Sequence, residues 1–373
     1  MWNEGIHVQN QQKGLSNFQV SALVTLSAVG MIIISIPRIA AEQAGIDGAL
    51  AVFLAGILSI ILAGVIITLS KRFPTKTVIE YSQEILGKLF GKVYGIILVL
   101  YSITVLSYIL RGFADALKVL LLPRTPLEIT MICMLLVILY CVHGGISTIV
   151  RTCEIFLLPL LLVIVLTIFF NLSEVQLFRY RSSLSNGITP VFKAAFGVTT
   201  AYLGYEILFF ILPFIQDKEK FMIFGIRGTV LPVLIYSGLV FVMIGVLGPT
   251  TTSELVYPAI HLARQIGIEF IERFDILFII FWILAVFTTL TSYLYMASFS
   301  LTRVLGMRNY KPFILILLPL CYVASILPQN ISEINMIGKI VNYVGFFVAL
   351  SSIPLLIIAV IRKKGGKANA EKE

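Results

Sequence analysis

The sequence has few charged residues for its size. Only 13% of its 373 residues are Asp, Glu, Lys or Arg, whereas 58% are hydrophobic. A soluble globular protein has roughly 25% charged residues, so this composition excludes an ordinary water-soluble domain. Apolar runs of about 20 residues, long enough to cross the hydrocarbon core of a bilayer, recur along the chain. The composition therefore predicts an all-α polytopic membrane protein.

Histidine and cysteine are also scarce. The three histidines lie far apart in the sequence, and the four cysteines have no CxxC spacing. The sequence contains no phosphate-binding loop and no Ser–His–Asp arrangement that could be placed on one site. We therefore expect no enzymatic activity, no cofactor and no metal site, and we expect the cysteines to act as packing residues.

The apolar runs predict ten transmembrane helices. They cover residues 16–36, 48–70, 91–113, 126–143, 152–170, 190–212, 225–247, 274–302, 311–328 and 335–361. We expect a single membrane domain over 16–361, with one five-helix repeat over 16–170 and a second over 190–361. Residues 1–15 and 362–373 are the expected terminal segments. The first run lacks a small-residue cleavage site, so we expect it to be retained as a span. The 248–273 loop is expected to hold one short amphipathic helix.

The net charge of +9 is distributed unevenly. With ten spans both termini face the same side, and most Lys and Arg residues fall in the loops of that side. The positive-inside rule therefore predicts cytoplasmic termini. The same charge is expected to contact anionic lipid, and we expect no binding of nucleic acid.

The first span is interrupted in the stretch "AVGMIIISIPRIA", residues 28–40. Pro37 has no N–H, so a continuous helix would leave the carbonyl of Ile33 without its donor. Gly30 permits a non-helical turn and a close approach of other groups. In hydrocarbon the freed backbone groups need partners from protein, water or a ligand.

The sixth span, "PVFKAAFGVTTAYLGYEILFFILPF", repeats this pattern. Gly204 lies as far into its span as Gly30 lies into the first, and Pro213 is expected to close the span. Interrupted spans at corresponding positions of two inverted halves indicate a substrate site near the middle of the membrane. A second interpretation stays open, because prolines also interrupt other spans and a Gly–Pro pair often only kinks a helix.

The combination of "SIPRIAAEQAG", "YLGYE" and "GIEFIERFD" resembles the spore germination permeases. These are the B subunits of GerA-type nutrient germinant receptors and a branch of the amino acid–polyamine–organocation (APC) superfamily. The resemblance implies a LeuT-like 5+5 inverted-repeat fold with broken helices 1 and 6, and a mid-membrane amino-acid pocket. It also implies an A subunit and a lipoprotein C subunit as partners in the inner membrane of the spore. Many relatives carry G-x-G in the first break, whereas this chain has Gly30-Met31-Ile32, which is expected to affect the size of the ligand.

A zwitterionic amino acid needs hydrogen-bond donors for its carboxylate and acceptors for its ammonium group. Broken helices supply both, as half-helix N–H groups and freed carbonyls. We expect the carboxylate to bind the backbone of Gly30–Ile32. The ammonium group is expected to meet carbonyls near Thr199, Thr200 and Leu203.

Side chains of the third and eighth spans are expected to complete the pocket. Tyr101 and Val105 are four residues apart and share a helical face, which Tyr108 extends. Thr289 and Tyr293 have the same spacing in the eighth span. The resemblance places these positions beside the pocket, although such residues also commonly pack membrane helices.

Two groups of charged residues allow more than one interpretation. Glu206 is the carboxylate that lies clearly within a span, where it either relays a proton or locks a gate, or else accepts hydrogen bonds from unwound backbone in a structural role. Glu272, Arg273 and Asp275 precede or begin the eighth span. They either form a gate or partner contact at its outer mouth, or belong to a solvated helix start.

The leading functional hypothesis is a germinant-receptor subunit that binds an amino acid or similar nutrient and signals through its partner subunits. A proton- or sodium-coupled amino-acid transporter is the alternative, and a scaffold with an inactive pocket is a third. The fifth span has no lysine of the kind that some proton-coupled relatives carry. The hydroxyl-rich stretch 288–291 of the eighth span would still suit sodium.

Overall fold

The structure is a computed structural model that describes residues 14–185, 187–267 and 273–365. Its α-helices are α1 (Asn17–Ala28), α2 (Ile36–Ala44), α3 (Gly48–Lys71), α4 (Val78–Leu86), α5 (Lys88–Leu120), α6 (Leu127–His143), α7 (Ile146–Asn171), α8 (Thr189–Gly197), α9 (Leu208–Ile211), α10 (Phe221–Leu247), α11 (Pro249–Glu254), α12 (Pro258–Arg264), α13 (Phe274–Val304), α14 (Lys311–Ile326), α15 (Ile331–Leu350) and α16 (Ser352–Ile361). Short 3-10 helices η1 (Met31–Ile34), η5 (Thr199–Tyr202), η6 (Tyr205–Ile207) and η7 (Leu212–Phe214) lie inside the interrupted spans.

The described residues form a helical membrane protein. Six helical stretches are long and apolar enough to cross a membrane, and three shorter apolar helices accompany them. Strands are missing from the described ranges, where the β pairing recorded is an isolated bridge between Leu15 and Ile215. The expected all-α membrane class is confirmed. The number of ten spans, the division into two repeats and the single-domain boundaries stay predictions.

The first span is interrupted earlier than the position of its proline indicates. A capping box between Ser16 and Gln19 starts α1, which ends at Ala28. The 3-10 helix η1 and then α2 follow the non-helical Gly30. Pro37 lies in the first turn of α2, where a backbone N–H is not needed, so the first span is interrupted as expected, with the break at Gly30 and Pro37 at the start of the second half. The N–H that Pro37 lacks would lie in the first turn of α2, where the helix would not use it.

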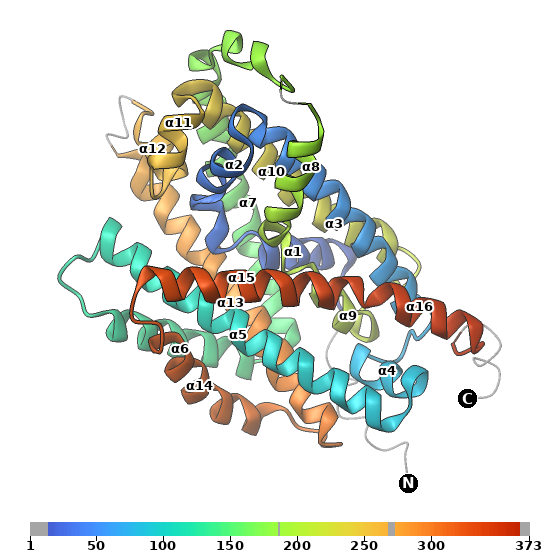
Figure 1. Ribbon diagram of the computed structural model, residues 1–373. Coiled ribbons are helices and arrows are strands. Elements are labelled where there is room, and N and C mark those ends of the chain that lie inside the picture. The colour runs from blue at the N-terminus through green and yellow to red at the C-terminus, as the bar shows by residue number, and fades with distance from the viewer. Residues whose placement is uncertain (1–13, 186, 268–272, 366–373) are drawn as a thin grey trace.

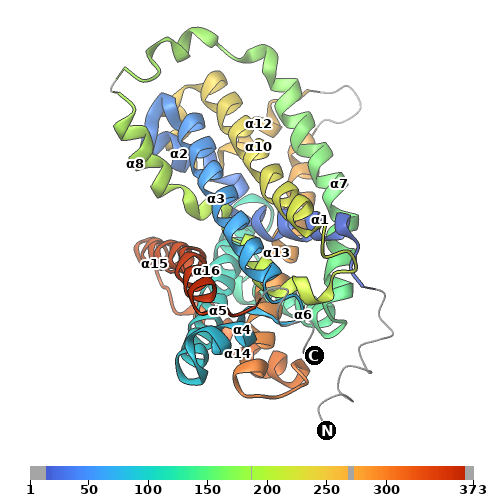
Figure 2. The ribbon, with the colours of Figure 1, turned by 90° about the vertical axis from the view of Figure 1, so that its right-hand side faces the viewer.

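The sixth span is broken more thoroughly. The helix α8 ends at Gly197, and a series of short 3-10 turns leads to the four-residue helix α9. Gly204 has φ of +125°, which an L side chain rarely adopts. Pro213 lies in η7, at the expected end of the span. The helix α1 contacts α7, α10, α13 and η6, which places both interruptions inside the bundle (Figures 1 and 2).

Three further elements differ from the expected pattern. The last span is divided at Ser351 into α15 and α16. The loop expected to hold one amphipathic helix holds two, α11 and α12. A short helix, α4, lies between the second and third spans and packs on α5. Turn chemistry at single residues sets these features, and hydrophobic periodicity does not report it.

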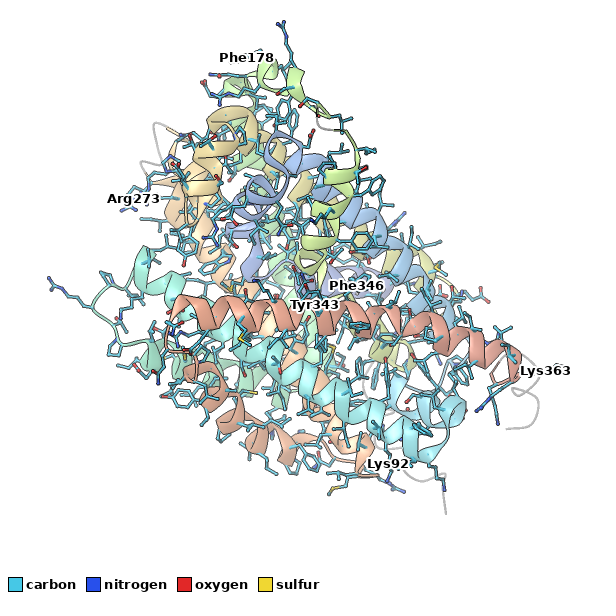
Figure 3. All side chains as sticks on the ribbon, viewed as in Figure 1. Lys92, Phe178, Arg273, Tyr343, Phe346 and Lys363 are labelled. Carbon is cyan, nitrogen blue, oxygen red and sulfur yellow. The ribbon has the colours of Figure 1, made fainter. Side chains whose placement is uncertain are left out.

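The two ends of the bundle can be distinguished by labelled side chains. Figure 3 shows Lys92 and Lys363 toward one end and Phe178 and Arg273 toward the other. We call these the Lys92 end and the Arg273 end. The helix α5 begins at the Lys92 end, because Lys92 lies in its first turns.

Several contacts close the Lys92 end. The N–H of Leu15 donates to the carbonyl of Phe214 at 2.9 Å, and the N–H of Gln216 donates to the carbonyl of Leu15 at 3.2 Å. These bonds join the start of the first span to the end of the sixth. Arg303 of α13 lies 3.5 Å from the carboxylate of Glu80 in α4, which connects the eighth span to the same surface.

Candidate functional site

The two interrupted spans meet in the middle of the molecule. Gly204 lies so close to the end of α1 that a Cβ atom at this position would collide with the backbone of Ser27 and Ala28. A Cβ atom on Gly30 would lie 2.5 Å from the hydroxyl oxygen of Thr289 in α13. Glycine at both positions therefore allows the first, sixth and eighth spans to approach at one point.

Side chains of neighbouring helices satisfy the carbonyls at the unwound end of α1. The hydroxyl of Thr289 donates to the carbonyl of Leu26 at 2.8 Å. The hydroxyl of Tyr236 in α10 donates to the carbonyl of Ala28 at 3.0 Å. Uncompensated backbone groups are costly in hydrocarbon, so these hydroxyls explain how the break is tolerated at this depth.

Glu206 connects the second break to the third span. Its side chain is buried, with 1% exposed, and one carboxylate oxygen accepts a 2.6 Å hydrogen bond from the hydroxyl of Tyr101. The other oxygen accepts the N–H of Gly204 at 2.5 Å. The carboxylate thus holds the unwound backbone of the sixth span against α5. If Glu206 has a structural role, it must accept hydrogen bonds from unwound backbone, and the bond from Gly204 is of this kind. A role in proton transfer or gating stays a prediction.

Tyr293 lies against this carboxylate network and interacts electrostatically with Tyr101 and Glu206. Its ring packs edge-on against the ring of Tyr101, with centroids 6.1 Å apart. Its hydroxyl is buried and has no hydrogen-bond partner among the described residues. Val105, one turn further along α5, is also buried. An unpaired buried hydroxyl costs free energy unless a further group completes its hydrogen bonding.

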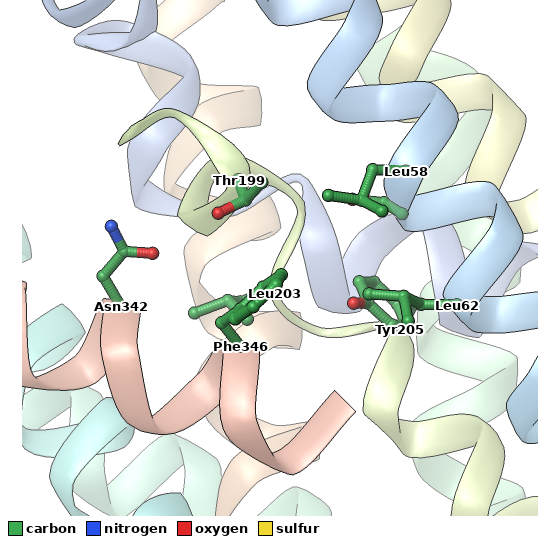
Figure 4. A pocket seen from close by; sticks show the side chains of 8 residues that line it. Leu58, Leu62, Thr199, Leu203, Tyr205, Asn342 and Phe346 are labelled. Atoms are coloured by element: carbon green, nitrogen blue, oxygen red, sulfur yellow. The ribbon is translucent and has the colours of Figure 1, made fainter. Parts of the chain in front are cut away.

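Thr199 and Leu203 lie beside a cleft that adjoins the second break. They line this narrow cleft between η5, α3 and α15, in which Asn342 and Phe346 face them and Leu58 and Leu62 lie opposite (Figure 4). Ser59 and Tyr205 complete the lining. The cleft has about 230 Å³ of empty space including its open mouth, but the centre of a water molecule reaches only about 10 Å³ of it, roughly the room for one water.

The backbone groups expected to bind a ligand are partly engaged with each other. The N–H of Gly30 donates to the carbonyl of Ala28 at 3.0 Å. The carbonyl of Thr200 accepts the N–H of Leu203 at 3.1 Å. Met31 and Ile32 are half-buried at the start of η1, where a helix leaves its first N–H groups without internal acceptors.

The charged residues before the eighth span lie at the Arg273 end. Asp275 is fully buried and accepts hydrogen bonds from Arg273 at 2.9 Å and from Arg264 of α12 at 3.2 Å. The hydrogen bond to this carboxylate raises the pKa of the Arg273 guanidinium, so the pair stays charged. Glu272 lies outside the described residues. This ion pair fastens α12 to α13, and its part as a gate or partner contact stays a prediction.

Several residues of the centre were not predicted from the sequence. Ser292 of α13 shares a 2.8 Å hydrogen bond with Ser27, and Tyr236 has the role described above. Gly345 of α15 lies against the hydroxyl of Tyr101 and the side chain of Leu203, where no larger residue fits without movement. The available signal was the pair Gly338 and Gly345, seven apart in one apolar helix, because small residues at helical spacing mark close helix contacts.

The described residues contain no group of three or more His, Cys, Asp or Glu side chains placed to hold a metal ion. The chemistry of this centre is that of hydroxyls, one carboxylate and unwound backbone. Such an arrangement can bind a small polar molecule and can change its helix contacts when that molecule enters.

Comparison with known proteins identifies the fold. The chain is similar to the structure of Mhp1, a nucleobase-cation-symport-1 family transporter, with a TM-score of 0.65, 13% identity, and coverage of 96% of this chain and 81% of that one. It is equally similar to MhsT in complex with L-phenylalanine, with a TM-score of 0.65, 16% identity, and coverage of 94% and 89%. The expected LeuT-like fold is thereby confirmed.

Comparison with curated sequences identifies the family. The chain is 25% identical to spore germination protein A2 of Bacillus subtilis (strain 168), over 94% of this chain and 96% of that protein. It is 28% identical to spore germination protein YndE of the same organism, over 90% and 93%. The sequence pattern described as "Spore germination protein" matches residues 14–334. The chain is therefore a membrane protein with a LeuT-like fold that belongs to the spore germination protein family, as the residues of its two breaks and its eighth span indicated.

Proposed function

We propose that this protein is the nutrient-binding subunit of a germinant receptor, with a small amino acid or a chemically similar nutrient as its ligand. It binds this ligand between the interrupted first and sixth spans and signals germination through A and C partner subunits. Its place is the inner membrane of the spore, with both termini in the cytoplasm. Support comes from the spore germination family and from the contact between the two breaks at the centre of the helical bundle.

The buried hydroxyl of Tyr293 is the single observation that carries the ligand site. Among the described residues it has no hydrogen-bond partner of ordinary geometry, although it interacts with Tyr101, whose own hydroxyl donates to Glu206. A polar ligand beside Tyr101, Val105 and Thr289 would complete its hydrogen bonding. An apolar ligand would leave this hydroxyl unpaired, whereas a polar ligand would pair it. The site would therefore select polar ligands.

The backbone contacts suggest a more specific pose. Because the N–H of Gly30 is already engaged, the carboxylate of the ligand would bind chiefly at the N–H groups of Met31 and Ile32. The ammonium group would compete with the N–H of Leu203 for the carbonyl of Thr200, or would use the carbonyl of Thr199. Entry of the ligand would therefore separate the two breaks, since the cleft beside them holds only about one water.

This separation would supply the signal. A ligand shifts a conformational equilibrium only by binding one arrangement better than the other. Moving the sixth span away from the first would strain the Leu15–Phe214 contact at the Lys92 end. A partner subunit on that side would sense the change.

Spore germination provides the test. In spores that lack other germinant receptors, we expect single amino acids to cause a fall in optical density when the wild-type protein is present with its partner subunits. We expect Tyr293→Phe to raise the half-maximal concentration of the active amino acid about tenfold or more, because a hydrogen bond to the ligand is lost. An unchanged dose response in Tyr293→Phe would contradict the proposed site.

A coupled amino-acid transporter is the second candidate, favoured by the fold shared with Mhp1 and MhsT. The two functions predict different results in sealed vesicles that contain this chain alone. A transporter would accumulate labelled amino acid when a proton or sodium gradient is applied. The receptor would bind the amino acid without accumulation.

A further inference from the structure

Met31 occupies a position that a glycine on the neighbouring helix makes possible. Its sulfur and terminal methyl group lie where a Cβ atom on Gly112 of α5 would be, so any larger residue at 112 would displace them. Gly112 is buried, and the 3-10 helix that begins with Met31 contacts α5, α12 and α13. The Met31 side chain is thus seated in a notch of α5.

This notch lies between the candidate site and the Arg273 end of the molecule. Because α5 begins at the Lys92 end, Gly112 is about 16 Å beyond Tyr101 in the direction of the Arg273 end. Gly30, the residue before Met31, abuts Thr289 of the site. Next to the notch, Phe113 packs on the ring of Trp282, with centroids 5.7 Å apart. Met31 therefore separates the site from that end.

The chemistry of this contact suits a movable plug. Met31 stays half-buried, whereas residues 33–36 are buried, so its side chain borders a more open space. Methionine is flexible and repacks at low cost. The indole N–H of Trp282, next to the notch, is buried without a hydrogen-bond partner among the described residues, so a polar molecule there would have a donor to bind.

We propose that Met31 and Gly112 form a gate between the mid-membrane site and the Arg273 end, with Met31 as the plug and Gly112 as its seat. The gate rests on the proposed site, because it controls access to that site. Displacing Met31 from its seat opens the route, and the size of the residues at positions 31 and 112 sets which ligands pass.

Accessibility of a cysteine reporter tests the gate without any ligand. The background protein carries Cys133→Ser, which removes the exposed cysteine and leaves the buried ones, and Thr289→Cys serves as the reporter. The rate of its modification by a small, water-soluble thiosulfonate is measured on purified protein. We expect Met31→Ala to raise this rate about tenfold and Met31→Leu to leave it near the background rate.

The seat is tested on the same reporter. We expect Gly112→Ala to raise the rate as Met31→Ala does, and the double variant to react no faster than the faster single variant. Gly95→Ala is the matched control, because this α5 glycine packs on Val304, away from Met31, and is expected to leave the effect of Met31→Ala unchanged.

The gate is overturned if Met31→Ala or Gly112→Ala leaves the modification rate of the reporter cysteine unchanged. It is also overturned if the rate increase in the double variant equals the product of the two single increases. If Gly112→Ala does not fold, the comparison of Met31→Ala with Met31→Leu decides. Because no nutrient is present, a protein that binds no amino acid can still pass this test. Failure of the gate is thereby separated from failure of the proposed function.

Discussion

Glu206 is the residue on which the arrangement of the centre depends most. Its carboxylate accepts one hydrogen bond from the third span and one from the unwound backbone of its own span. A buried carboxylate is expensive unless its oxygens are hydrogen-bonded. The Tyr101 hydroxyl and the Gly204 N–H therefore satisfy both carboxylate oxygens and stabilise the shape of the second break.

The two tyrosines of the centre are expected to respond differently to loss of the hydroxyl. Tyr101→Phe removes a hydrogen bond to a buried carboxylate, so we expect it to lower the free energy of unfolding by about 1.5–3 kcal/mol. Tyr293→Phe removes an unpaired hydroxyl, so we expect the ligand-free protein to keep its stability. Thermal unfolding of the purified proteins measures both. A Tyr293→Phe variant as unstable as Tyr101→Phe would show that Tyr293 is paired in the free state.

Gly204 is expected to be intolerant of any side chain. Gly204→Ala combines an unfavourable φ with a collision against the backbone of Ser27, so we expect a loss of about 3 kcal/mol or more. Gly306→Ala is the matched control, since Gly306 also has positive φ but a Cβ atom there meets nothing within 4 Å. We expect a loss of about 1 kcal/mol for that variant. Equal losses in thermal unfolding would contradict the close contact of the two breaks.

At the scale of elements, α4 is a short helix whose stability depends on its first turn. Thr77 and Glu80 form a capping box, in which Glu80 accepts the N–H of Thr77 at 2.7 Å. Glu80 also faces Arg303 of the eighth span. Glu80 therefore connects the first turn of α4 to α13.

Loss of the cap should loosen α4 without unfolding the bundle. We expect Thr77→Ala to cost about 1 kcal/mol locally and to raise amide exchange in residues 78–86 about fivefold. Glu80→Gln keeps an acceptor oxygen but loses the charge that faces Arg303. We expect a smaller rise for that variant, because partly exposed ion pairs contribute little. Hydrogen exchange of both variants is the measurement, and a larger effect of Glu80→Gln would contradict this assignment.

The elements also show which parts of the site the sequence could reveal. Helical spacing pairs Tyr101 with Val105 and Thr289 with Tyr293, and the resemblance brings the two helices together. In the structure the rings of Tyr101 and Tyr293 pack against each other, and their part in binding stays a prediction. Helical spacing did not reveal that Thr199 and Leu203 line a cleft toward α3 and α15. Residues of 3-10 turns point in directions that the period of an α-helix does not give.

Proline and glycine show the same limit. The sequence predicts the interruption between Gly30 and Pro37, but not that Pro37 lies in the first turn of α2, because proline suits the first helical turn as well as it disrupts an interior. The need for glycine at position 112 depends on Met31, which comes from another span. A contact between distant segments of this kind is set by tertiary packing, which a single sequence does not contain.

At the scale of the whole molecule, the structure unites a transporter fold with membership of the spore germination family. The protein is held shut by its own contacts, namely the contact of the two breaks and the bonds at the Lys92 end. The Tyr293 hydroxyl lies unpaired beside the first of these. The proposed ligand would replace some of those contacts with its own. Binding should then stabilise an opened arrangement of the same helices.

The most direct test of this account is thermal unfolding of the purified protein in lipid nanodiscs with each amino acid in turn. We predict that at least one amino acid stabilises the wild-type protein, by about 2.7 kcal/mol at a concentration of 100 times its Kd. We also predict that Tyr293→Phe, unfolding at the same temperature as the wild type without ligand, loses most of that stabilisation. Stabilisation of wild type and Tyr293→Phe to the same extent, or by none of the amino acids, would contradict the proposed site.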